Sequence, residues 1–241
     1  MKRPHCDRTS RSNLLLSILF VRRATLEERE PHLLLLYQEY LSSENTARFV
    51  SRVAHRYTLS TLERLAWGRR TTRRAAVLAL GYLGDYNVNA VLGRALHDKD
   101  RGVRLLAENV IRDVWQRDGS RNHQHDLGRI VRWNQCGRLL EAVDLSSKIL
   151  EVNPHFAEVW NQRAIAYFQL EDFEQSAEDC HMALELNPYH FGAAVGMGHC
   201  YLEINDAYAA LECFRRALKI NPALEGVRAQ VGYLERTLDG R

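Results

Sequence analysis

Three Asn-Pro dipeptides divide the second half of the chain into units of equal length. They are Asn153-Pro154, Asn187-Pro188 and Asn221-Pro222, and successive dipeptides lie 34 residues apart. Proline cannot continue a helix and moves the residue before it out of the helical region, so each dipeptide ends one helix and precedes the next. A fixed period of this length is typical of stacked repeats, in which no unit buries its apolar face alone.

A second break near the middle of each unit predicts that the unit contains two helices. The breaks lie at Gly137-Arg138, Glu171-Asp172 and Asn205-Asp206. Each unit is therefore expected to be a hairpin of two helices of about 14 residues joined by a tight turn. The segment 225–238 repeats only the first helix of a unit and then ends in a charged tail, so it is predicted to cap the array.

Residues 157–188 resemble a tetratricopeptide (TPR) repeat. The residues at that family's spacings are Trp160, Ala164, Tyr167, Ser176, Ala183 and Pro188. The next unit keeps Gly198, Tyr201, Ala210, Ala217 and Pro222, whereas 123–154 keeps only Ala142 and Pro154 clearly. The small residues Ala164 and Gly198 are expected to let two helices approach closely.

A second and shorter period precedes the Asn-Pro units. Residues 72–85 and 103–116 align with an offset of 31, and a helical pattern at 88–98 lies between them. This resembles HEAT-like repeats, whose aspartate followed six residues later by an arginine is matched by Asp98 and Arg104. Upstream, helical patterns continue and no alternating strand pattern occurs. The predicted fold class is all-α, a right-handed α-α superhelix (solenoid) of HEAT-like and then TPR hairpins.

These patterns predict three parts of the chain. Residues 1–30 are expected to form a basic and apolar segment, partly disordered, 31–118 a HEAT-like array, and 119–241 a TPR domain. The TPR domain is divided into units at 123–154, 155–188 and 189–222 and a capping helix at 224–238. The apolar run 14–21 resembles the middle of a signal peptide, but it is too short to span a bilayer and has no cleavage site, which favours a frayed start or a short docking helix. Whether 13–23 is a targeting or a docking segment stays open.

The composition favours a globular protein without catalytic chemistry. The chain is 46% hydrophobic and 26% charged, and its five cysteines form no Cys-x-x-Cys pair, which suggests small buried residues in a reducing, cytoplasmic setting. No nucleophile elbow or phosphate loop occurs, and His123, His125 and Asp126, which could recruit a metal, have no partner cluster elsewhere in the sequence. We therefore predict no enzyme activity, no cofactor and no metal. Residues 1–118 carry a net charge of +8 and 119–241 a net charge of −5.

The resemblance to TPR repeats implies a concave face lined by the first helix of each unit. On this face we expect a groove for a segment of a partner protein, with Phe168 and Ile165 as anchors. The groove residues are predicted to be Glu158, Asn161, Gln162, Ile165, Phe168, Gln169, Val195, His199, Leu202 and Glu203, with Leu127, Val131 and Asn134 as counterparts in the first unit. The cations that clamp chaperone carboxylates in some TPR domains are missing from the matching places. Alternatively, Ile165 and Phe168 only pack the solenoid.

Two other functions stay open. Arg69, Arg70, Arg73 and Arg74 have spacings that share a helix face, which would suit anion binding by a nucleic-acid-associated HEAT-repeat protein. HEAT-like repeats also resemble those of bilin-lyase relatives, which would imply an accessory subunit or chaperone of a cofactor-bearing enzyme. The first hypothesis, a non-catalytic adaptor or scaffold, is preferred because the chain has two repeat types and no catalytic constellation.

Overall fold

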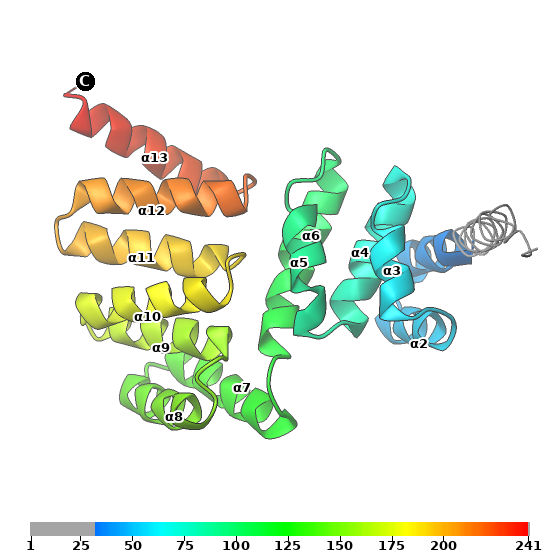
Figure 1. Cartoon of the computed structure of the whole chain (residues 1–241), viewed down its shortest axis with the longest axis horizontal. Helices are drawn as coiled ribbons and strands as arrows, with labels where there is room; N and C mark the ends of the chain where they lie inside the picture. The colour runs from blue at the N-terminus through cyan, green and yellow to red at the C-terminus, as the bar shows by residue number, and fades with distance from the viewer. Residues whose placement is uncertain (1–31, 241) are drawn as a thin grey trace, which may run out of the picture. The chain divides into compact units, whose positions relative to one another are not determined.

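A computed structural model describes residues 32–240, and these residues form helices with no strand among them (Figure 1). The all-α fold class is thereby confirmed. The predictions for residues 1–30 and for the apolar run lie outside the described residues. A helix at 32–43 is followed by these elements: α2 (Thr46–Arg56), α3 (Leu59–Leu65), α4 (Arg70–Leu83), the 3-10 turn η1 (Tyr86–Val88), α5 (Asn89–Ala95), α6 (Arg101–Gln116), α7 (Arg121–Gln135), α8 (Leu139–Val152), α9 (Ala157–Gln169), α10 (Phe173–Leu186), α11 (Phe191–Glu203), α12 (Ala207–Ile220) and α13 (Glu225–Leu238).

The chain divides into two compact units, and the division falls after Ala79, within α4. The described part of the first unit is a small helical array with Leu33, Phe49, Val53 and Leu62 buried. The second unit holds α5 to α13. The predicted boundaries near 30 and 118 stay predictions, and so does the HEAT-like repeat.

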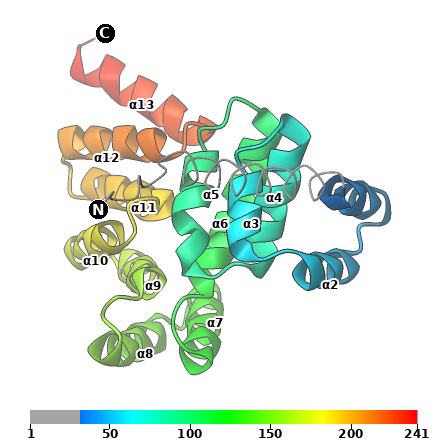
Figure 2. The ribbon, with the colours of Figure 1, turned by 45° about the vertical axis from the view of Figure 1, so that its right-hand side comes forward.

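The second unit contains three helical hairpins, α7–α8, α9–α10 and α11–α12, followed by α13, and the hairpins stack side by side (Figures 1 and 2). The second helix of each hairpin ends directly before Asn153, Asn187 or Asn221, as the dipeptides predict. Within each hairpin the turn contains one residue in the left-handed region, at the predicted break. These residues are Gly137, Glu171 and Asn205, with φ values of 73°, 62° and 62°.

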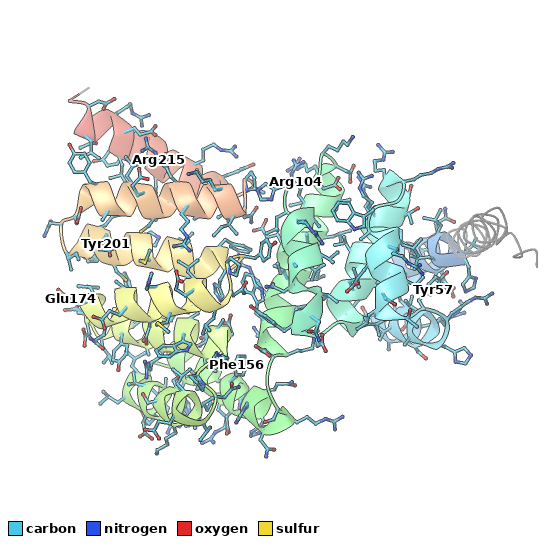
Figure 3. All side chains as sticks on the ribbon, viewed as in Figure 1. Tyr57, Arg104, Phe156, Glu174, Tyr201 and Arg215 are labelled. Atoms are coloured by element: carbon cyan, nitrogen blue, oxygen red, sulfur yellow. The ribbon has the colours of Figure 1, made fainter. Side chains whose placement is uncertain are left out.

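The hairpins pack through small residues that face large ones. A Cβ atom on Gly198 would lie 2.6 Å from Cε1 of Phe214, so glycine is required where α11 meets α12. The three largest fully buried side chains of this array are Phe156, Phe191 and Phe214, and Phe156 is labelled in Figure 3. Close approach of the helices therefore depends on side-chain size, as the repeat pattern predicts.

Two ion pairs connect neighbouring helices of the array. Arg163 on α9 makes a bidentate contact with Asp179 on α10, at 2.7 and 2.8 Å, and also donates to Ser147 on α8. Burial raises the pKa of Asp179, and the hydrogen bond and charge of Arg163 act against that rise. Arg215 on α12 pairs with Glu235 on α13 at 2.7 Å, which fastens the last helix (Figure 3).

Helices α5 and α6 pack against the loops that carry the Asn-Pro dipeptides. The indole N–H of Trp115 donates to Oδ1 of Asn89 at 2.8 Å, and Nδ2 of Asn89 donates to Oδ1 of Asn187 at 2.9 Å. The hydroxyl of Tyr86 donates to the carbonyl of Leu186 at 3.1 Å, and burial raises the pKa of Tyr86 to about 12, so the phenol stays neutral. In this unit the helices before residue 119 and those after it therefore share one packed interface.

The arginine of the HEAT-like pattern donates hydrogen bonds to backbone carbonyl groups. Arg104, labelled in Figure 3 near the start of α6, donates to the carbonyls of Asp98 and Lys99 at 2.8 and 3.3 Å. These bonds close the turn between α5 and α6.

The three repeat asparagines are expected to differ in their contribution to stability. Asn187 is fully buried and accepts from Asn89 and from the Tyr189 N–H, so Asn187→Ala leaves two donors unpaired and should lower the free energy of unfolding by about 2 kcal/mol. Asn221 accepts only from the Ala223 N–H, and Asn221→Ala should cost about 1 kcal/mol. Urea unfolding of the two variants measures the difference, and equal losses would contradict the role of Asn187 in holding α5.

Substitution of two glycines should have opposite effects on stability. Gly198→Ala places a methyl group against the Phe214 ring and should lower the free energy of unfolding by about 1–3 kcal/mol. The matched control is Gly226→Ala on exposed α13, where no atom lies within 4 Å of the added Cβ. That variant should gain up to about 1 kcal/mol because alanine favours helix. A neutral Gly198→Ala would show that α11 and α12 are not closely packed there.

Candidate functional site

A cavity of about 500 Å³ lies between α6, α9 and α11. We call it the groove cavity. It is lined by Arg112, Trp115 and Gln116 of α6, by Glu158, Asn161, Gln162, Ala164, Ile165, Phe168 and Gln169 of α9, by Ser176 and Cys180 of α10, and by His190, Phe191, Gly192, Gly196 and His199 at α11. A volume of this size suits a ligand group or part of a peptide.

The groove cavity collects most of the residues predicted from the sequence. Seven of the ten predicted groove residues line it, namely Glu158, Asn161, Gln162, Ile165, Phe168, Gln169 and His199. The other three, Val195, Leu202 and Glu203, lie on α11 outside its lining. Their suggested binding role stays a prediction, as does that of the seven that line the cavity.

Glu158 forms the floor of the groove cavity. It is 6% exposed, and one carboxylate oxygen, Oε1, accepts from Gln162 Nε2 at 2.8 Å and from Asn161 Nδ2 at 3.3 Å. The other oxygen, Oε2, faces Nε2 of His190 at 3.0 Å. Both oxygens therefore have hydrogen-bond partners inside the protein.

The hydrogen bonds of His190 determine its tautomer. The backbone N–H of Ala193 donates to Nδ1 of His190 at 3.0 Å, so this nitrogen carries no proton. A neutral imidazole has one N–H, which is then at Nε2 and donates to Glu158. His190 is thus neutral here and serves as the N-cap of α11. The carboxylate of Glu158 receives three hydrogen bonds from neutral groups.

Asn161 presents an acceptor to the groove cavity. Its amide nitrogen points at the carboxylate of Glu158, and the reverse orientation would set two oxygens against each other, so the amide orientation is fixed. Oδ1 has no hydrogen-bond partner within residues 32–240, although the residue is only 8% exposed. Asn161 lines the cavity, so its Oδ1 is an acceptor that a ligand there could use.

Aromatic side chains form the walls. Trp115 stacks on His190 with ring centroids 4.3 Å apart and contacts Phe191 at 5.3 Å. On α9, Phe168 packs edge-on against Phe173 at 5.4 Å, and Ile165 next to it is 38% exposed. At the rim, the guanidinium of Arg112 lies 4.9 Å from the centre of the Phe191 ring and 3.9 Å from Glu108.

His199 and Cys180 of the lining favour their neutral forms. Burial lowers the pKa of His199, which favours its uncharged form. A hydrogen bond with Cys200 and burial raise the pKa of the Cys180 thiol well above its usual range. Cys180, Cys200 and Cys213 are buried as expected, whereas Cys136 is exposed because it ends α7 at a turn.

The arginines predicted to bind anions do not form one free face. Arg69 precedes α4 and Arg70 begins it, and both are exposed. Arg73 and Arg74 are half-buried, and Arg73 donates to the carbonyl of Gly68 at 3.1 Å. Anion binding at this cluster stays a prediction.

The described residues contain neither a candidate metal cluster nor a candidate membrane-spanning helix. Within residues 32–240, no group of three or more His, Cys, Asp or Glu side chains could hold a metal ion. None of the helices in this range has the length and apolar character that crossing a membrane requires.

The contribution of α6 to the cavity, and those of His190 and Phe191, were not predicted from the sequence. The helical pattern of 103–116 places Trp115 on its apolar face, but periodicity does not reveal which surface that face meets. For His190, the available signal was its position directly before a helix, where a capping side chain is expected.

Known proteins share the repeats of this chain. Family models described as tetratricopeptide repeat match residues 157–190 and 192–224. A TPR repeat-containing protein of Rhizobium etli is 29% identical over 147 residues, which are 59% of this chain and 69% of that protein. Human tetratricopeptide repeat protein 12 is 28% identical over 63% of this chain, but this covers only 20% of its own length.

A solved structure was also found to be similar. The first TPR of Spaghetti (RPAP3), bound to an HSP90 peptide, shares 22% identity, covers 47% of this chain and 90% of its own, and has a TM-score of 0.45. The family models and the sequence relatives agree with the hairpins α9–α10 and α11–α12. The chain therefore contains tetratricopeptide repeats, in residues 157–190 and 192–224.

Proposed function

We propose that this protein is a non-catalytic adaptor that binds a segment of a partner protein in the groove cavity. The observation that carries the proposal is the cavity itself, about 500 Å³ in volume, on the helices that begin the two TPR units. Both family models that match are tetratricopeptide repeats, which are typically protein-interaction modules.

The chemistry of the lining suits a peptide. Ile165 and Phe168 offer apolar area, while amide side chains offer hydrogen bonds for a backbone or polar side chain. Ile165 is among the exposed large apolar residues, which supports its role as an anchor that a partner would bury. The lining contains one arginine, Arg112, and no lysine, so a clamp for a partner's carboxylate is not favoured.

Partner recovery by affinity purification with quantitative mass spectrometry tests the proposal. The variant Ile165→Arg combined with Phe168→Ala should reduce recovered partners at least about tenfold, because it places a charge in the groove cavity and removes an anchor. Val152→Arg is the matched control, since Val152 is 72% exposed and lies on α8, away from the cavity. Undiminished recovery by a groove variant with wild-type circular dichroism would refute the assignment.

A further inference from the structure

We propose that the groove cavity selects a basic side chain, lysine or arginine, as the anchor of the partner segment. This inference rests on the proposed function and adds the chemistry of the ligand. It depends on three features: the charge of Glu158, the free oxygen of Asn161, and the aromatic walls.

The first feature is a buried carboxylate whose charge has no counterion. Glu158 accepts hydrogen bonds from Asn161, Gln162 and His190, and all three donors are neutral. Within residues 32–240 no lysine or arginine pairs with Glu158. A buried charge is normally paired, because hydrogen bonds from neutral groups do not cancel its field. A cation in the groove cavity would supply that partner.

The second feature is an acceptor directed at the ligand. Asn161 lines the cavity, and because Glu158 holds its amide nitrogen, the atom left for a ligand is Oδ1, which accepts hydrogen bonds and cannot donate them. Ammonium and guanidinium groups carry only donors, whereas a carboxylate carries only acceptors and would be repelled. The floor of the cavity therefore discriminates by hydrogen-bond type as well as by charge.

The third feature is the wall, which fits the rest of a basic side chain. The ring of Phe168 and the exposed side chain of Ile165 can cover the methylene stem, and aromatic rings also attract cations. The cation at the rim, Arg112, already lies over Phe191 and beside Glu108, and its side chain is 56% exposed. At longer range, residues 119–241 carry a net charge of −5, which favours the approach of a basic segment.

A phage-displayed library of random nonapeptides, selected on the immobilised full-length protein, tests the proposal. Peptides recovered by the wild type should be enriched in lysine or arginine at one position. In a synthetic copy of a selected peptide, replacing that residue with norleucine should weaken binding about tenfold, because the charge and donors are lost while the stem is kept. This measurement uses the wild-type protein and does not depend on how a variant folds.

Two variants test whether the preference for a basic residue depends on Glu158. Glu158→Gln should reduce the preference for the lysine peptide over the norleucine peptide to about onefold, whereas Glu174→Gln, at an exposed position of α10 outside the cavity lining, should keep it. Selected peptides that lack a basic residue, or carry an acidic one, and that lose binding with Ile165→Arg would overturn this inference and leave the groove intact. Peptide binding that Ile165→Arg leaves unchanged would overturn the proposed function as well.

Discussion

Two buried asparagine side chains, Asn89 and Asn187, connect helices that the sequence assigns to different repeats. Asn187 belongs to the 34-residue period, and Asn89 lies at the start of α5. Through Asn89 the indole of Trp115 is held in place, and Trp115 then covers His190. The groove cavity has an α6 wall because of this chain of contacts. Without it, the first helices of the TPR units would present an open concave surface.

The sequence predicts the fold well because its signals are local. Asn-Pro dipeptides end helices by the chemistry of proline, and Gly198 identifies a close helix contact that the structure shows against Phe214. The site is predicted in part for the same reason: the α9 residues follow from the repeat position. The α6 wall could not be predicted, since the contact between Trp115 and His190 joins residues 75 positions apart and depends on how two arrays pack.

The polarity of the groove cavity distinguishes it from surfaces that bind acidic peptides through cations. Its floor is a carboxylate, and its amide groups are oriented by that carboxylate with the nitrogen inward. A single glutamate on α9 thus determines which way the neighbouring amide groups of Asn161 and Gln162 are oriented. The proposed selectivity of the groove cavity would therefore reside in residues that the repeat pattern leaves free.

His190 has a consequence for the energetics of binding. Nδ1 of His190 accepts a hydrogen bond from the backbone N–H of Ala193 in the first turn of α11, and Nε2 contacts the carboxylate of Glu158. The carboxylate is therefore held at the start of a helix. A ligand entering the groove cavity meets a floor that is already organised, and little conformational entropy is lost there on association. The same anchoring makes the floor resistant to remodelling. Affinity at this position therefore depends on how well the ligand complements a rigid surface, and induced fit contributes little.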